Sequence, residues 1–126
     1  EYEFDGHNFR SRFEMAVAKS IKDLHLNYKY DAGVHLHTQK DYPDFTLAFP
    51  EFNRCVFLEV MGALDQVKYV DKNSNKFKEF SLAGYCIGSD LFIIGANEHT
   101  MPNPAEVDQM IIYIVSSLCA KYVRRV

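Results

Sequence analysis

Apolar residues recur along this chain with two different spacings, and the spacing changes from segment to segment. Within residues 11–24 they recur every three or four positions, which predicts an amphipathic helix. Apolar and polar residues then alternate over 28–36, 45–49 and 56–60, which predicts three strands. The PEFN segment at 50–53 lies between the last two strands and has the composition of a turn. The first half of the chain is therefore expected to fold as a helix followed by three strands.

The second half predicts two helices with one strand between them. A helix is expected over 65–83, although residues 73–75 are poor helix formers. Residues 91–94 are typical of a short buried strand, and Pro104 suits the first turn of a last helix. Strands joined by short turns pair antiparallel, and a helical crossover returns the next strand parallel. The predicted fold is α/β, with a mixed sheet flanked by helices and a C-terminal helix whose inward positions are Val107, Ile111, Ile114 and Leu118.

Composition, charge and cysteine spacing restrict the classes of protein that fit this sequence. The chain has 126 residues, 48% hydrophobic and 25% charged, which predicts one domain over residues 1–126. The sequence contains neither a bilayer-spanning apolar run nor a leader pattern, so we expect a soluble, cytoplasmic protein with no membrane partner. A net charge of −3 is not typical of a protein that coats nucleic acid nonspecifically. Cys55, Cys86 and Cys119 lack metal-site spacing and are expected to be small buried apolar residues.

Two acids, Asp44 and Glu59, occupy related positions in the second and third predicted strands. If residues 50–53 form a four-residue hairpin loop, Phe49 pairs with Arg54, Phe45 pairs with Leu58, and Asp44 falls opposite Glu59. Opposed residues have Cβ atoms roughly 4.5–5.5 Å apart, so the two carboxylates would repel unless a cation lies between them. A hard divalent ion would suit this position. Alternatively, both acids lie in water at frayed strand ends, and a one-residue slip would put them on opposite faces.

Glu14 is a third candidate acid with two interpretations. The SRFE segment at 11–14 fits a capping box, in which Glu14 bonds back to the backbone of Ser11. Glu14 also follows Phe13 at the edge of the buried stripe, so its carboxylate could reach toward the sheet. The two interpretations are compatible in part.

The order of the segments SRFE, YPDFTL and FLEVMG and the lysine-bearing helix after them resembles the PD-(D/E)xK nuclease superfamily. The resemblance covers residues 11–94 and implies a restriction-endonuclease-like αβββαβ core. In it, Pro43 and Asp44 match the PD, Glu59 matches the (D/E), and Glu14 sits where many members carry an acid on the first helix.

Met61 departs from the pattern, because it stands where the superfamily has a lysine. Either the site is inactive or the lysine comes from elsewhere. In some members the lysine lies on the following helix, in a pattern of GxLD, Tyr, Lys and an aromatic residue. Gly62, Leu64 and Asp65, followed by Tyr69, Lys76 and Phe80, match that spacing here. This match implies that Lys76 replaces the missing lysine; alternatively, Lys76 extends into solvent as Lys72 and Lys78 would.

The resemblance implies a metal-dependent endonuclease that hydrolyses phosphodiester bonds, with DNA as the expected nucleic acid. Mg²⁺ or Mn²⁺ would be held by Glu14, Asp44, Glu59 and the backbone carbonyl of Val60. Asp44, Glu59 and Lys76 would be the catalytic residues, with Lys76 orienting water or stabilising negative charge. Nucleic-acid binding is expected from Arg12, Lys68, Tyr69, Lys72 and Lys78, although such basic residues are also typical of solvated helix faces. The alternative function is a catalytically inactive nuclease-fold module for nucleic-acid binding or assembly, and a homodimer or further domains of a parent protein stay open as partners.

Overall fold

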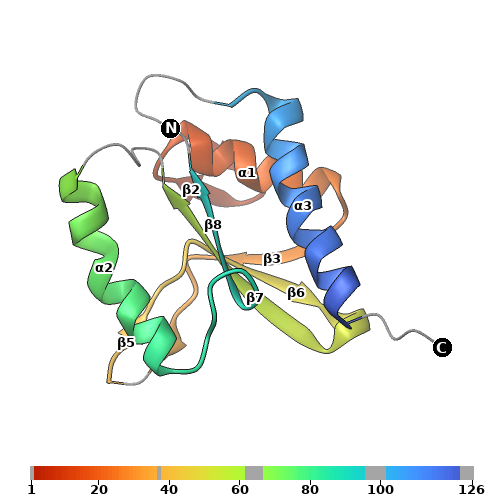
Figure 1. The fold of residues 1–126 in the computed structure, drawn as a ribbon. Coiled ribbons are helices and arrows are strands. Elements are labelled where there is room, and N and C mark those ends of the chain that lie inside the picture. The colour runs from red at the N-terminus through yellow and green to blue at the C-terminus, as the bar shows by residue number, and fades with distance from the viewer. Residues whose placement is uncertain (1, 37, 62–66, 96–101, 123–126) are drawn as a thin grey trace.

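The computed structural model describes residues 2–36, 38–61, 67–95 and 102–122, with only the backbone described over 67–73 (Figure 1). Three helices and eight strands are found among these residues. The elements in chain order are β1 (Tyr2–Phe4), β2 (His7–Phe9), α1 (Arg12–Asp23), β3 (Asn27–Tyr30), β4 (Val34–His35), β5 (Lys40–Asp41), β6 (Phe45–Phe49), β7 (Arg54–Met61), α2 (Val67–Leu82), β8 (Leu91–Gly95) and α3 (Pro104–Tyr122).

All three predicted helices are confirmed, and two of them have a clear local cause. Helix α1 follows the N-cap Ser11, whose hydroxyl oxygen accepts a hydrogen bond of 3.1 Å from the backbone N–H of Glu14. Helix α3 begins at Pro104, which lacks the N–H that a first-turn residue leaves unpaired. The inward positions predicted for α3 are buried, namely Val107, Ile111, Ile114 and Leu118.

The central sheet has four strands in the order β3-β6-β7-β8. Strands β6 and β7 pair antiparallel in the predicted register, with Phe45 opposite Leu58 and Phe49 opposite Arg54. A short 3₁₀ turn, Pro50–Phe52, connects them, and Asn53 closes it in the left-handed conformation at φ 53°. Strand β8 returns parallel to β7, as the helical crossover predicts. The sheet is therefore mixed, and the predicted α/β class is confirmed.

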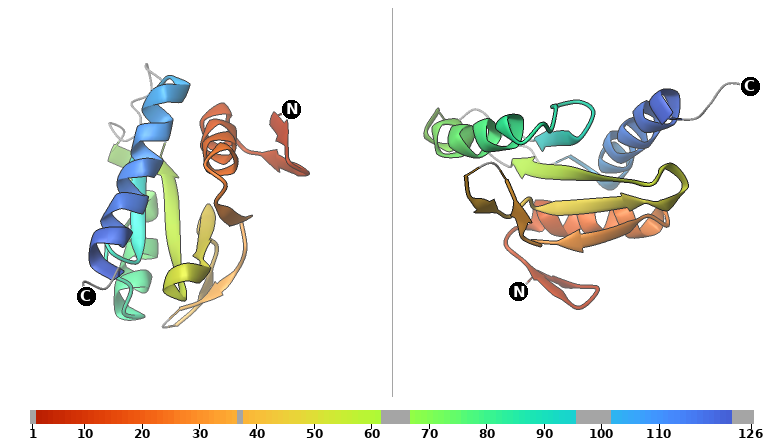
Figure 2. Two further views of the ribbon diagram at one scale, coloured as in Figure 1. Left: turned by 90° about the vertical axis from the view of Figure 1, so that its right-hand side faces the viewer. Right: turned by 90° about the horizontal axis from the view of Figure 1, so that it is seen from below.

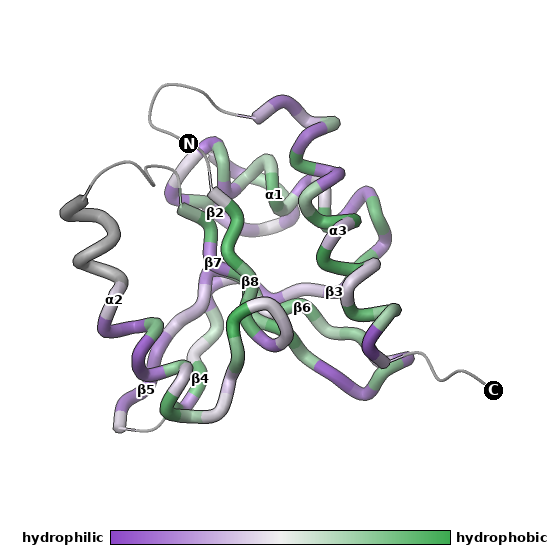
Figure 3. The backbone as a smooth tube through the Cα atoms, in the orientation of Figure 1, coloured by the Kyte–Doolittle hydropathy of each residue, from purple (hydrophilic) through white to green (hydrophobic). Residues whose placement is uncertain are grey.

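Helices cover both faces of this sheet (Figure 1). The larger apolar cluster joins α1 and α3 to alternate residues of β6, β7 and β8. On that face, α3 lies beside β8, and α1 lies toward the β3 side (Figure 2). The smaller cluster, Phe57, Phe80 and Leu91, joins α2 to the opposite face. Strand β8 is hydrophobic along almost all of its length because both clusters draw on it (Figure 3).

Two parts of the fold differ from the sequence prediction. The strand expected over 28–36 stops at Tyr30, because Asp31 adopts a left-handed conformation at φ 55° that ends the extended run. The chain then forms a separate small hairpin from β4 and β5. A hairpin that pairs β1 with β2 was also not predicted.

The prediction for the cysteines is wrong. Cys55 and Cys86 are exposed, and Cys119 is half-buried. Cys55 lies on the same face of β7 as Phe57, which belongs to the smaller apolar cluster. Cys55 is closer to the hairpin loop and lies outside that cluster, so it is not covered. None of the helices in the described residues is both long enough and apolar enough to span a membrane.

Candidate functional site

Asp44 and Glu59 lie side by side at one end of the β6–β7 pair. Asp44 follows the buried Pro43 and precedes the first residue of β6, and extension of the observed register places it opposite Glu59. Both acids are buried, with 8% of Asp44 and 2% of Glu59 exposed to solvent. Oδ2 of Asp44 accepts a hydrogen bond of 2.7 Å from the backbone N–H of Val60. These positions contradict the alternative in which both acids lie in water at frayed strand ends.

Burial changes the protonation of this carboxylate pair. Burial, together with the neighbouring charge of Asp44, raises the pKa of Glu59 to about 8, although Lys76 opposes the rise. Burial also raises the pKa of Asp44, while the Val60 N–H favours its ionised form. The two carboxyl groups interact directly, which favours the ionised form of Asp44 and the protonated form of Glu59. Burial of both groups therefore favours a protonated carboxyl over full ionisation of the pair.

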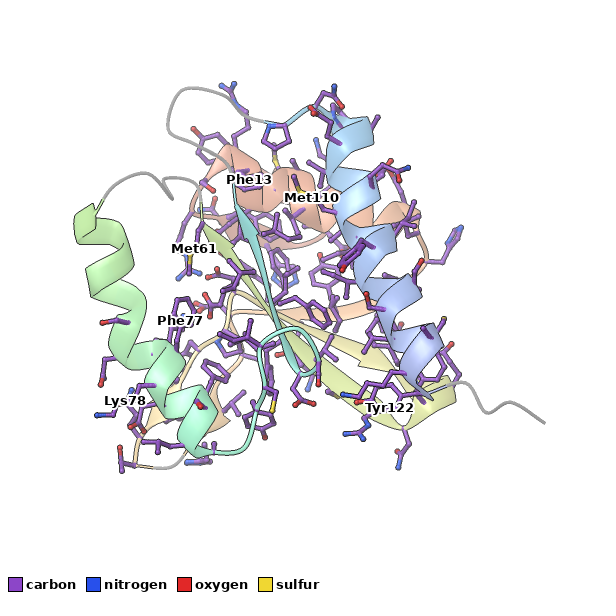
Figure 4. All side chains as sticks on the ribbon, viewed as in Figure 1. Phe13, Met61, Phe77, Lys78, Met110 and Tyr122 are labelled. Carbon is purple, nitrogen blue, oxygen red and sulfur yellow. The ribbon has the colours of Figure 1, made fainter. Side chains whose placement is uncertain are left out.

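Lys76 reaches this pair from α2. Its Nζ lies 2.8 Å from Oε1 of Glu59, donates a hydrogen bond of 3.0 Å to the carbonyl oxygen of Tyr42, and lies 4.0 Å from Oδ1 of Asp41. The side chain is only 19% exposed, whereas Lys78 is exposed and points away from the sheet (Figure 4). Lys76 therefore does not extend into solvent beside Lys78. The ammonium group of Lys76 on α2 therefore lies next to the carboxylate of Glu59 on β7.

One oxygen of Glu59 has unusual surroundings. Its buried Oε1 accepts no hydrogen bond from any group in the described part of the chain, although the Lys76 ammonium is within ion-pairing distance. The contact therefore has the distance of an ion pair without the angles of a hydrogen bond. Within the described residues, the Lys76 ammonium is the charged partner of this oxygen.

Glu14 serves both as a cap residue and as part of the acidic site. Its backbone N–H is bonded to Ser11, but its carboxylate oxygen Oε1 accepts from the backbone N–H of Arg10 at 3.0 Å instead of closing a capping box on Ser11. The same oxygen accepts from the hydroxyl of Tyr30 at 2.7 Å. Burial and this hydrogen bond raise the pKa of Tyr30 to about 12, so the hydroxyl stays a donor at neutral pH. The carboxylate of Glu14 is thus held at the start of α1 and faces the sheet.

Arg10 connects Glu14 to Asp44. Its Nη2 lies 2.9 Å from Oδ1 of Asp44 and 3.4 Å from Oε2 of Glu14, and its Nη1 lies 3.6 Å from Oδ1 of Asp31. The guanidinium also lies over the ring of Tyr30 at 5.5 Å. The acids on α1 and β6 therefore meet across a positive charge supplied by the chain itself.

Met61 ends β7 two residues after Glu59 and on the same face of the strand. It is buried and lies in the space between β7 and α2 (Figure 4). A thioether cannot donate a hydrogen bond or carry positive charge, so Met61 cannot replace a lysine at this position.

The remaining predicted residues are described only in part. Arg12 and Lys78 are exposed on α1 and α2. The side chains of Lys68, Tyr69 and Lys72 lie outside the described residues, and so do Gly62, Leu64 and Asp65 of the displaced-lysine pattern.

The donor set fits a divalent ion only in part. In the described ranges, no three His, Cys, Asp or Glu side chains come close enough together to hold a metal. Asp44 and Glu59 do supply adjacent oxygen donors, including the buried Oε1 that accepts no hydrogen bond. Mg²⁺ and Mn²⁺ prefer oxygen ligands, and Mg²⁺ often binds one or two carboxylates and keeps several waters. Two carboxylates are therefore suitable ligands, whereas Glu14 faces Arg10, and the carbonyl of Val60 stays a predicted ligand.

Arg10, Tyr30, Asp41 and Tyr42 belong to this site but were not predicted. Alternation in the 28–36 segment put Tyr30 in a strand, without indicating that its hydroxyl reaches Glu14. The sequence shows that Arg10 and Arg12 belong to a basic N-terminal segment. The contact of Arg10 with Asp44, however, depends on how α1 approaches the sheet.

A comparison with protein-family models and with curated protein sequences finds no match for this chain.

Proposed function

We propose that this protein is a metal-dependent nuclease of the PD-(D/E)xK type that hydrolyses phosphodiester bonds, with DNA as the expected substrate. The order of elements supports a restriction-endonuclease-like core. Helix α1, strands β3, β6 and β7, helix α2 and strand β8 follow one another as αβββαβ, apart from the inserted β4–β5 hairpin. Helix α3 is then an addition to this core.

The observation that carries the proposal is the position of Lys76. Its ammonium lies 2.8 Å from Oε1 of Glu59, while Met61 occupies the usual lysine position of the motif. A positive charge in a largely buried site needs anionic partners, and here the nearer partner is Glu59, an acid that the motif assigns to metal binding, with Asp41 farther away. The displaced-lysine form of the motif accounts for both facts together.

The site residues have distinct chemical roles in this proposal. A bound Mg²⁺ or Mn²⁺ would supply Lewis-acid stabilisation and a water of lowered pKa. Asp44 and Glu59 would hold the ion, with Glu59 losing its proton. Lys76 would orient the attacking water or stabilise the charge that develops on the phosphate. Glu14 would add negative charge from α1.

Exposed cations near the site would hold the nucleic acid. Arg12 begins α1, and Lys78 lies on α2 two residues after Lys76. Together with Lys68 and Lys72, these residues would contribute salt-dependent affinity for the phosphate backbone without reading sequence, and Tyr69 would add an uncharged contact.

The decisive experiment is a cleavage assay on plasmid and single-stranded DNA with Mg²⁺ or Mn²⁺, each with and without chelator. The parent chain should cut in the presence of metal and lose activity with chelator. Asp44→Ala should be inactive, while Asp23→Ala, which removes an exposed carboxylate at the end of α1, should cut like the parent. Cleavage that survives the loss of Asp44 would refute the proposed site.

A catalytically inactive nuclease-fold module is the second candidate. It is favoured by the internal pairing of the site, because Arg10 pairs with Asp44 and Lys76 pairs with Glu59. It is also favoured by Met61 at the usual lysine position. On this alternative the chain binds DNA in a salt-dependent manner but cuts no form of it with any divalent metal.

A further inference from the structure

We propose that the guanidinium of Arg10 is a built-in counter-ion that competes with a divalent ion for Asp44 and Glu14. The inference deepens the proposed function and rests on its metal site. It assigns to Arg10 a role in setting metal affinity, which the superfamily motif does not include.

The position of one nitrogen supports this role. Nη2 of Arg10 faces Oδ1 of Asp44 at 2.9 Å and Oε2 of Glu14 at 3.4 Å, so it bridges acids that belong to two different elements. The second oxygen of each acid is already held, Oδ2 of Asp44 by the Val60 N–H and Oε1 of Glu14 by the Tyr30 hydroxyl. The oxygens that Arg10 bridges are thus the ones that could turn to a metal ion.

Arg10 and a divalent ion would compete for these oxygens. Divalent metals of this class bind carboxylate oxygens at about 2.0–2.6 Å, closer than the guanidinium contacts, and two cations at such range repel each other strongly. Binding of the ion at Asp44 therefore favours withdrawal of the guanidinium.

The surroundings of Arg10 make its withdrawal inexpensive. Its side chain is 55% exposed, and Nη1 already lies 3.6 Å from the more exposed Asp31. The ring of Tyr30 offers a face on which the guanidinium can stay stacked. Lys76 differs, because it is largely buried and also bonded to the carbonyl of Tyr42. Arg10 is therefore the exchangeable cation of the pair, and Lys76 is the fixed one.

Calorimetric titration of the folded chain with Mn²⁺ at low ionic strength tests the exchange. Arg10→Gln should bind Mn²⁺ about fivefold to tenfold more tightly than the parent, because the competing charge is gone. The matched control is Arg54→Gln, which removes a guanidinium at the other end of β7, roughly 16 Å of strand away from Glu59, and should bind as the parent does. Circular dichroism establishes that each variant is folded.

A second measurement needs no loss of charge. In the parent chain, the side-chain Nε–Hε resonance of Arg10, assigned by comparison with Arg10→Lys, should shift when Mg²⁺ is added.

The outcomes separate the inference from the proposed function. Tighter binding in Arg10→Gln, or binding in that variant alone, supports the exchange. Equal or weaker binding in a folded Arg10→Gln, or Mg²⁺ binding without a shift of the Arg10 resonance, overturns the exchange but leaves the metal site standing. If neither protein binds Mn²⁺, both the exchange and the metal-dependent function are wrong.

Discussion

Thr38 donates two hydrogen bonds to the same carboxylate oxygen of Glu79, from its backbone N–H at 3.0 Å and from its hydroxyl at 2.7 Å. This contact ties the β4–β5 hairpin to α2, only three residues after Lys76. The same hairpin leads into Asp41 and Tyr42, whose oxygens surround the Lys76 ammonium. The Thr38–Glu79 contact therefore fixes the hairpin that holds Lys76 in place.

Removal of this contact should loosen the hairpin. Glu79→Ala leaves the Thr38 N–H without its acceptor, so we expect faster amide hydrogen exchange at Thr38 and a loss of about 2 kcal/mol in the free energy of unfolding. Thr38→Val removes only the hydroxyl and should cost about 1 kcal/mol. Unchanged exchange at residue 38 in Glu79→Ala would contradict this account.

The stability of the protein should fall as pH rises from 5 to 8.5. Burial and the charge of Asp44 raise the pKa of Glu59 to about 8, above its value in the unfolded chain. A carboxyl group with a raised folded pKa contributes its full stability below the unfolded pKa, and that contribution is lost as pH rises through the folded value. Urea unfolding should show a decrease on the order of 2 kcal/mol over this window. The side chain in Glu59→Gln cannot ionise, so the free energy of unfolding of this variant should fall less over the same window, by that amount. Parallel pH profiles for the two proteins would contradict the assignment.

Substitutions at Ser11 and Glu14 should distinguish the contribution of the helix cap to stability from the contribution of the acidic site to cleavage. Ser11→Ala removes the acceptor of the Glu14 N–H and should cost about 1 kcal/mol of stability, while leaving DNA cleavage intact. Glu14→Gln keeps an acceptor for Tyr30 but loses the negative charge, so stability should change little while cleavage falls. Thermal unfolding and cleavage are measured on both variants. If Glu14→Gln cuts like the parent, Glu14 serves only the structure around Arg10 and Tyr30.

Particular residues show what could be predicted from the sequence. The facing position of Asp44 and Glu59 followed from strand alternation and a four-residue turn, because a period of two and a loop length together determine a hairpin register. The N-terminal hairpin was not predicted, although the sequence contains a signal for it. Its turn is the Asp5-Gly6 pair, with φ 54° and 78°, and Asp-Gly between two apolar segments is a strong hairpin signal.

Other features depend on tertiary approach and have no local signal. Alternation continued through Asp31, and only the left-handed conformation of this residue shows where the strand ends. The bridge from Arg10 to Asp44 joins residues 34 positions apart, and it depends on the angle at which α1 meets the sheet. The exposure of Cys55 depends on how far α2 extends along β7, which composition does not determine.

Metal affinity should depend on Asp44. Calorimetry with Mn²⁺ should show binding in the parent chain and little in Asp44→Ala, because the variant keeps only one of the two adjacent carboxylates. Asp23→Ala serves as the control for the loss of one negative charge. Equal heats of binding in the parent and Asp44→Ala would remove Asp44 from the metal site.

Substitutions at Lys76 and Met61 test whether this protein is an enzyme. Lys76→Ala should lower cleavage by on the order of 10²-fold or more, since the loss of one positioned electrostatic donor costs roughly 2.7–4 kcal/mol in the transition state. Lys78→Ala removes the same charge from an exposed position of α2 and should instead weaken DNA binding modestly and flatten its salt dependence. Folding and Mn²⁺ affinity should stay close to those of the parent in both variants.

The reciprocal substitution at Met61 tests the inactive alternative. Met61 lies on the same face of β7 as Glu59, so Met61→Lys would bring a second ammonium toward the site. If Lys76 already supplies this charge, the new lysine should repel it and leave cleavage unchanged or lower. If the parent chain instead cuts no DNA with any metal, and Met61→Lys begins to cut, then the Lys76–Glu59 ion pair is structural and the protein is an inactive member of the fold.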